Sequence, residues 1–291
     1  MAAERRLPDW LKVRMPGGRN YLELRQVLKT SALHTVCEEA RCPNIGECWD
    51  RKTATFMVLG DICTRACSYC AVTSGRPGPV DLQEPARLAD AVERMALRYA
   101  VITSVDRDDL PDGGAFIFAQ CIKQIHDRIP GCKVEVLIPD FQGNWDALSA
   151  VMDAEPETLN HNIETVRRVF QRVRHRGDYD LSLELLHRAK RMGGRPVTKS
   201  GMMVGLGETW DEIVDTMRDL RSVDCDLLTI GQYLRPSDKH APLARWYTPR
   251  EFEELKEIGE ALGFKSVASG PLVRSSYHAD EQHEAAIKLL V

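Results

Sequence analysis

Several features that mark other classes of protein are missing from this sequence of 291 residues. No apolar run approaches the ~20 residues of a membrane-spanning helix, and the N-terminus lacks the apolar core of a secretory signal. Basic residues do not outnumber acidic ones, since the net charge is −4 and the pI is near 6.1. This balance argues against a general nucleic-acid-binding protein. We therefore expect a cytoplasmic protein with no nucleic-acid partner and no membrane association.

Histidine is absent between Cys37 and Cys70, although six of the nine cysteines lie in this stretch. Zinc sites commonly use two Cys-x2-Cys pairs, or complete one pair with histidine, and neither arrangement occurs here. Nine cysteines without a secretion signal indicate a reducing compartment and metal ligation, not disulfide bonds. The six cysteines instead form two triplets, each one ligand short of a four-coordinate site.

The second triplet is a Cys-x3-Cys-x2-Cys loop of Cys63, Cys67 and Cys70, directly after the apolar run Thr53–Gly60. Three thiolates can hold a [4Fe–4S] cluster and leave one iron open, whereas a structural zinc site closes all four positions. With Tyr69 before its last cysteine, the loop resembles that of the radical S-adenosylmethionine (SAM) enzymes. The resemblance implies that SAM binds the open iron. Zinc is the alternative, because cysteine spacing alone does not separate the two metals.

The first triplet has wider spacing, Cys-x4-Cys-x5-Cys, and consists of Cys37, Cys42 and Cys48. Pro43 and Gly46 favour a compact turn, which can bring the three sulfurs around one metal centre. Taken alone, this triplet also fits either an iron–sulfur cluster or zinc. We expect a second metal centre near the N-terminus.

The two triplets and the C-terminal stretch Arg274–Tyr277 together resemble the lipoyl synthase family, from Leu7–Lys12 to the end of the chain. The resemblance implies two [4Fe–4S] clusters and SAM as cofactors. It implies that the first triplet holds an auxiliary cluster whose fourth ligand is Ser276, with Ser275 as the alternative. Oxygen is a poorer partner for iron than thiolate, so such a cluster should open more readily.

The resemblance also implies the reaction, in which sulfur from the auxiliary cluster is inserted at C6 and C8 of an octanoyl chain on a carrier lysine. The implied partners are an octanoylated lipoyl carrier domain or the glycine cleavage H protein, an electron donor such as flavodoxin or ferredoxin, and an iron–sulfur carrier. A biotin-synthase-like sulfur-inserting enzyme and a non-catalytic, zinc-stabilised binding module are the alternatives. The N-terminal triplet and Arg274–Tyr277 argue against biotin synthase.

Apolar runs alternate with amphipathic stretches through most of the chain, which predicts six strand–helix units. The expected strands are Thr53–Leu59, Tyr99–Val105, Lys133–Pro139, Thr158–Ile163, Thr198–Val204 and Leu227–Leu234. The expected helices are Pro85–Leu97, Ala115–Arg128, Trp145–Met152, Val166–Val173, Leu181–Met192, Trp210–Leu220 and Pro249–Leu262. With right-handed crossovers, these units form an α/β fold, a partial (β/α)6 TIM-like barrel over residues 53–265. Residues 1–52 form an N-terminal extension with the first triplet, and residues 266–291 form a C-terminal cap.

Polar residues follow several of the expected strands, where barrel enzymes place their chemistry. Radical SAM barrels grip the methionine amino group after the second strand, which makes Ser104 and Asp106 candidates. Asn162 and Glu164 lie on the same side of an extended chain, and an amide and a carboxylate so placed can bind both ribose hydroxyls. A helix cap is the alternative role for this pair.

Two further SAM contacts are expected. Arg174, with Arg176 as the alternative, is a candidate clamp for the SAM carboxylate. Gly205 and Gly207 end the fifth strand, and glycine allows the backbone to approach an adenine ring closely.

Overall fold

The structure is a computed structural model that describes residues 7–13, 17–31, 33–39, 42–50, 54–192 and 196–289. Its central sheet contains, in spatial order, β1 (His34–Thr35), β2 (Thr55–Val58), β5 (Tyr99–Ser104), β6 (Lys133–Leu137), β7 (Thr158–Asn160), β8 (Val197–Val204), β9 (Leu227–Gln232) and β10 (Ser266–Gly270). Every neighbouring pair is parallel except β1 with β2. The order has two edge strands, β1 and β10, so the sheet is an open, partial barrel.

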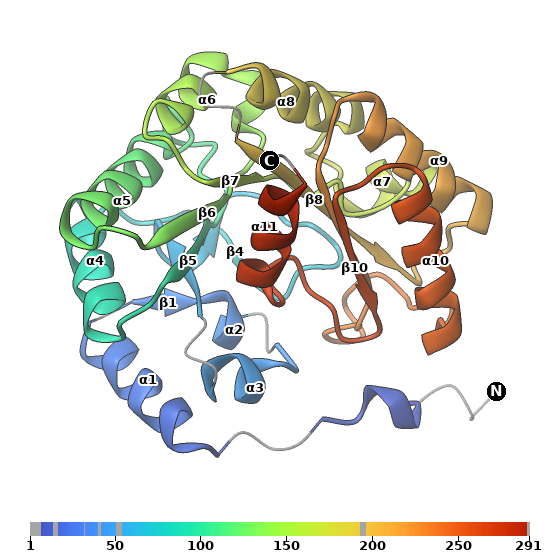
Figure 1. The fold of residues 1–291 in the computed structure, drawn as a ribbon, viewed down its shortest axis with the longest axis horizontal. Helices are drawn as coiled ribbons and strands as arrows, with labels where there is room; N and C mark the ends of the chain where they lie inside the picture. The colour runs from blue at the N-terminus through green and yellow to red at the C-terminus, as the bar shows by residue number, and fades with distance from the viewer. Residues whose placement is uncertain are drawn as a thin grey trace.

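Helices surround this sheet in an arc (Figure 1). They are α4 (Glu84–Arg94), α5 (Ala115–Arg128), α6 (Trp145–Met152), α7 (Arg167–Val173), α8 (Tyr179–Arg191), α9 (Trp210–Ser222) and α10 (Pro249–Ala261). Sequence signals start several of them. Thr248 caps α10 through a capping box with Glu251, and Pro249 occupies the first position of this helix. The expected strand–helix alternation is confirmed for all six units.

The strand β10 lies outside the six units that the sequence predicts. It pairs in parallel with β9, from Ser266 opposite Leu227 to Gly270 opposite Gly231. Its residues are mostly small, so its sequence carries little of the β-branched and aromatic signal of a strand. The residues expected to form only a cap therefore also extend the parallel sheet.

The N-terminal part contains η2 (Asp9–Leu11), α1 (Arg19–Thr30), α2 (Val36–Glu39) and α3 (Ile45–Asp50). Tyr21 of α1 stacks on the buried ring of Trp49 in α3, with 5.1 Å between ring centroids. This contact packs α1 against the helix that carries Cys48. The N-terminal residues that hold the first triplet are thereby fixed beside β1 and β2.

The last helix, α11 (Ala279–Lys288), covers the end of the sheet where the strands begin. Its His283 hydrogen-bonds Thr158, the first residue of β7, over 2.9 Å, and its Ala286 packs on Val197 and Leu227. The opposite end, where the parallel strands finish, is left for the site. None of the helices in the described residues is both long enough and apolar enough to pass through a membrane.

Candidate active site

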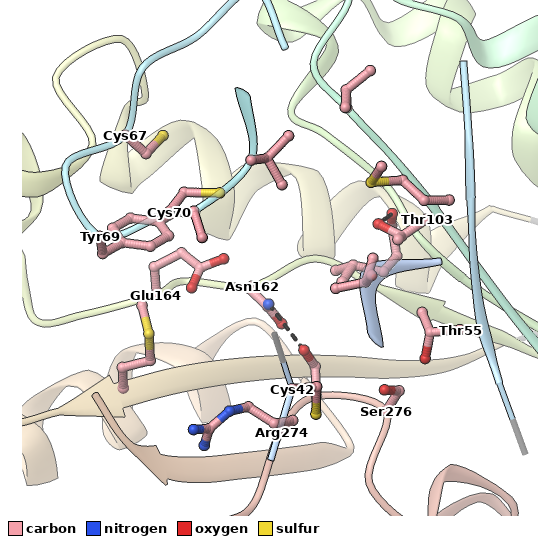
Figure 2. A pocket seen from close by; sticks show the side chains of 18 of the residues that line it. Cys42, Thr55, Cys67, Tyr69, Cys70, Thr103, Asn162, Glu164, Arg274 and Ser276 are labelled. Carbon is pink, nitrogen blue, oxygen red and sulfur yellow. Dashed lines mark hydrogen bonds between the residues drawn. The ribbon is translucent and has the colours of Figure 1, made fainter. Parts of the chain in front are cut away.

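A cavity of about 540 Å³ lies at the carboxyl ends of the parallel strands, where barrels of this kind carry their chemistry. Segments far apart in the chain line it (Figure 2). Cys37 and Cys42 come from the N-terminal part, Cys63 follows β2, and Ser276 follows β10. The fold therefore brings the whole second triplet, two cysteines of the first and the C-terminal serine motif to one cavity.

The loop of the second triplet joins β3 (Ile62–Cys63) to β4 (Thr73–Ser74), and Cys63, Cys67 and Cys70 all line the cavity. The backbone N–H of Cys70 donates to the carbonyl of Cys67 over 3.1 Å, which closes a tight turn between these two ligands. The N–H of Asp106 donates to Cys63 Sγ over 3.3 Å. The sulfur of Cys63 is thus held against the end of β5.

The second residue after Cys63, Arg65, anchors the loop. Its side chain is 1% exposed and hydrogen-bonds Asp108 and Asp140, with the shortest distances 2.8 and 2.6 Å. Although burial raises the pKa of Asp140, the hydrogen bonds with Arg65 lower it to about 2. Sequence reasoning missed both Arg65 and Asp140. The position of Asp140, directly after an expected strand, was the available signal.

Burial raises the pKa of all three thiols in this loop, to about 11 for Cys63 and to about 12 for Cys67. Metal ligation requires the thiolate, so a metal centre must displace these protons when it binds. All three cysteines come from one short loop that lines the cavity, and a [4Fe–4S] cluster held by three thiolates keeps one iron open for a ligand there. The donor set fits a cluster.

The first triplet is assembled from two short helices. Cys37 lies in α2 and Cys48 in α3, and the N–H of Cys42 donates to the carbonyl of Cys37 over 3.0 Å. Cys37 and Cys42 line the cavity, whereas Cys48 is not among the lining residues. Asn44 Nδ2 donates to the carbonyl of Leu272 over 2.6 Å, which ties this triplet to the C-terminal segment.

The two serines of that segment differ in their contacts. Ser275 Oγ accepts a hydrogen bond from Asn162 Nδ2 over 3.2 Å, and both residues line the cavity. Ser276 also lines the cavity, and its hydroxyl takes part in no hydrogen bond with the described residues. Figure 2 shows Ser276 on the same side of the cavity as Cys42. Ser276 therefore has the freer oxygen near the first triplet.

Four buried polar atoms of the cavity lining lack a hydrogen-bond partner in the described structure. They are Ser104 Oγ, Asp106 Oδ1, Asn160 Oδ1 and Asn162 Oδ1. Buried polar groups are almost always hydrogen-bonded, so four unpaired atoms around one cavity fit a polar ligand there. Three of the four belong to residues that the sequence predicts as SAM contacts. Asn160 was missed, because its unpaired buried oxygen is a property of the folded structure.

Asn162 and Glu164 both line the cavity. Neither caps the following helix, because the N-cap of α7 is Val166 and no side chain caps it. Glu164 has φ of +67°, an unusual conformation for a non-glycine residue, and its N–H donates to the carbonyl of Gly201. Burial raises the pKa of its carboxyl, and the charge of Arg174 opposes this shift. The helix-cap alternative is therefore wrong, while ribose binding by this pair stays a prediction.

The structure separates the two arginine candidates. Arg174 is 6% exposed, lines the cavity and donates from Nη1 to the carbonyl of Asn162 over 3.2 Å. Arg176 has a side chain that is 54% exposed, and it donates to the carbonyl of Thr64. Only Arg174 is placed to reach a ligand in the cavity.

Gly205 and Gly207 do not line the cavity. Both have positive φ, +107° and +100°, in a turn whose N–H groups at Gly205 and Leu206 donate to the carboxylate of Glu208. A Cβ at position 205 would lie 2.3 Å from Gln232 Nε2. Turn geometry and close packing account for these glycines, and their contact with adenine stays a prediction.

An open α/β barrel with a three-cysteine loop at the carboxyl ends of its strands defines the chain as a radical SAM protein. The family model of the Radical SAM superfamily matches residues 57–220, which is more than half of the chain. Among solved structures, methylornithine synthase covers 78% of this chain and 67% of its own, with a TM-score of 0.51 at 13% identity. At that identity the likeness concerns the fold alone.

The particular family follows from the N-terminal part and from close relatives. A model of the N-terminal domain of lipoyl synthase matches residues 2–42. The lipoyl synthase of Rubrobacter xylanophilus is 60% identical over 96% of this chain and 87% of its own length. That of Symbiobacterium thermophilum is 58% identical over 97% and 88%. The chain belongs to the lipoyl synthase family, whose members are radical SAM enzymes that use SAM and [4Fe–4S] clusters.

Proposed function

We propose that this chain inserts sulfur at C6 and C8 of an octanoyl chain attached to a lysine of a carrier protein, and so forms lipoyl-lysine. The observation that carries the proposal is the convergence of Cys37, Cys42, Cys63, Cys67 and Cys70 on one cavity. Bound SAM and its cluster supply a radical that removes hydrogen from unactivated carbon, and the auxiliary cluster supplies sulfur. The chain itself positions both centres and the substrate.

The protein groups around the cavity are suited to holding SAM in one orientation. Ser104 and Asp106 offer unpaired oxygens at the end of β5 for the amino group. Asn162 and Glu164 offer an amide and a carboxylate for the ribose hydroxyls. Arg174 carries the positive charge for the carboxylate, in a buried position where such a contact is stronger than in water. These contacts fix the reactive carbon and exclude water from it.

Ser276 is our choice for the fourth ligand of the auxiliary cluster. The Ser276 hydroxyl makes no hydrogen bond with any residue that the structure describes, whereas the Ser275 hydroxyl already accepts one from Asn162, and this difference supports the choice. The other three ligands in the proposal are Cys37, Cys42 and Cys48. In this arrangement residues 1–52 and 266–291 act as the two parts that hold the auxiliary cluster, and residues 53–265 form the barrel that binds SAM.

The substrate in this proposal is an octanoylated lipoyl carrier domain or the glycine cleavage H protein. An electron donor such as flavodoxin or ferredoxin and an iron–sulfur carrier complete the set of partners. None of the nine cysteines forms a disulfide, and six of them are proposed cluster ligands, which supports work in a reducing compartment such as the cytoplasm.

Isotope labelling tests the proposal. The clusters are assembled with heavy sulfide, unlabelled sulfide is then added to the solution, and the protein is supplied with SAM, a reductant and an octanoyl-lysine peptide. We expect a product in which both sulfur atoms carry the label, because the auxiliary cluster is their source. A product with unlabelled sulfur would show an external donor and overturn the proposal.

A further inference from the structure

Four arginines line the cavity, and three of them have a carboxylate partner within 4 Å. Arg65 pairs with Asp108 and Asp140, Arg174 approaches Asp140 at 3.8 Å, and Arg235 pairs with Asp238 at 3.3 Å. Arg274 differs. The one hydrogen bond of its side chain within the described structure runs from Nη1 to the carbonyl of Val273 over 2.6 Å, and no carboxylate there pairs with the guanidinium.

The Arg274 side chain is partly buried, and a partly buried cation without a counter-charge is unfavourable unless another group compensates it. Figure 2 shows the side chains of Arg274 and Cys42 beside each other. The position of Arg274 therefore favours an anion on the side of the cavity that holds the first triplet.

A glycine in β9 leaves room for the C-terminal segment that contains Val273 and Arg274. Gly231 lies where the segment passes, and a Cβ at that position would be 2.1 Å from the carbonyl oxygen of Val273 and 3.1 Å from Arg274 Nη1. Any side chain at position 231 would push the segment away. The glycine thus allows Arg274 to lie close to the strand, with Ser276 two residues further along the cavity wall.

We propose that Arg274 is the counter-charge of the auxiliary cluster. This inference rests on the proposed function, because that function places a cluster on Cys37, Cys42, Cys48 and Ser276. A [4Fe–4S]2+ core with three thiolates and one alkoxide carries a net charge of −2, and this charge grows when the cluster is reduced. A fixed cation nearby stabilises the reduced form more than the oxidised form, so Arg274 raises the reduction potential.

The carboxylate of SAM is the other anion that this cavity is proposed to receive. Arg174 lies beside the second triplet, because the carbonyl of the preceding Val173 accepts a hydrogen bond from Ser68 in that loop, whereas Figure 2 shows Arg274 beside Cys42. The two arginines thus serve the two triplets separately. A test without SAM distinguishes the two anions.

The test uses the full chain with Cys63, Cys67 and Cys70 replaced by alanine, so that only the auxiliary cluster gives a signal. Arg274→Gln removes the charge, and Arg274→Lys keeps it. Arg128→Gln removes an equal charge from the outer helix α5, where Arg128 pairs with Asp90 and Glu93, and serves as the control. The reduction potential of each reconstituted protein is measured by a spectroscopic redox titration without SAM.

We expect Arg274→Gln to lower the ratio of reduced to oxidised cluster about tenfold at a fixed potential, a shift of about 59 mV for one electron. Arg274→Lys should retain more than half of the potential difference, and Arg128→Gln should leave the potential unchanged. If Arg274→Gln fails to assemble the cluster while Arg274→Lys assembles it, the charge is needed for assembly, which also supports the proposal.

Three results would overturn it. An unchanged reduction potential in Arg274→Gln would show that the charge of Arg274 does not act on the auxiliary cluster. If the same substitution in the otherwise intact protein then weakened SAM binding, Arg274 would be assigned to the SAM carboxylate. Loss of the cluster in both Arg274 variants would show a structural role that charge does not explain. If the protein with Arg274 intact holds no auxiliary cluster, the proposed function fails first, and this inference fails with it.

Discussion

Cysteines of both triplets line one cavity, but different parts of the chain hold each triplet in place. Cys63, Cys67 and Cys70 lie in one short loop, which Arg65 fixes to the ends of β5 and β6 through the partly buried Asp108 and the buried Asp140. The first triplet depends on the meeting of two distant parts of the chain. Its Asn44 is tied to Leu272, 228 residues away in sequence. One centre is therefore set by local structure in the barrel, and the other by the docking of the two ends of the chain.

The largest effect that separates the two centres comes from the loop itself. Cys63→Ala removes a ligand of the cluster that binds SAM, so SAM cleavage should be abolished. The auxiliary cluster should still assemble, because its ligands lie elsewhere. Formation of 5′-deoxyadenosine under anaerobic, reducing conditions measures the first effect, and about four irons per chain measures the second. A variant that still makes 5′-deoxyadenosine contradicts the assignment of Cys63.

The next largest effect is expected from Arg65, which anchors the loop of the second triplet. Arg65→Met removes the hydrogen-bonded partner of the buried Asp140 and the partly buried Asp108, which should destabilise the protein by about 3 kcal/mol. The iron of the SAM-binding cluster should be lost before that of the auxiliary cluster. Chemical denaturation and iron analysis measure these effects, with Arg128→Met on α5 as the control. Equal loss of both clusters would show that the loop and the first triplet are not independent.

A smaller effect is expected from the ribose contact. Asn162→Ala removes an amide whose oxygen is buried and unpaired in the described structure, so SAM binding should weaken by about 1–3 kcal/mol. Equilibrium binding under anaerobic conditions measures it. Asn144→Ala, which removes an amide that caps α6, is the control and should leave the affinity unchanged. Unchanged binding by Asn162→Ala would remove this residue from the SAM site.

The smallest expected effect concerns the contact that holds the first triplet against the C-terminal segment. Asn44→Ala removes the hydrogen bond to the carbonyl of Leu272, which should weaken the docking of the C-terminal segment by about 1 kcal/mol. The rate at which a chelator removes iron from the auxiliary cluster should rise, while SAM cleavage stays normal. If the chelator removes iron from both clusters faster, both clusters depend on the docking of the C-terminal segment, which would contradict the prediction.

The same contrast explains which parts of the molecule the sequence predicts. Cys63, Cys67 and Cys70 are close in sequence, so their spacing alone indicates one centre. The role of Ser276 came only from resemblance, because nothing in a polar tail indicates that it folds back onto residues near position 42. The pairing of Arg65 with Asp140 was missed for the same reason, since 75 residues separate the partners.

The fold was predictable where strands carry apolar side chains and helices carry caps. All six expected strands are present, and α5 and α6 begin and end at the expected residues. The strand β10 was missed, because its small residues lack a strand pattern and its pairing with β9 is what orders it. Asn160 was missed because an unpaired buried oxygen is a property of the folded structure.

The central claim is that the first triplet supplies sulfur and does not take part in SAM cleavage. The most direct test is Cys42→Ala, assayed with an octanoyl-lysine peptide for both 5′-deoxyadenosine and sulfur-containing product. Cys132→Ala removes a buried thiol before β6, outside the cavity lining, and is the matched control. We predict that Cys42→Ala cleaves SAM but yields no lipoyl product, while Cys132→Ala yields both. Lipoyl product from Cys42→Ala would contradict the account.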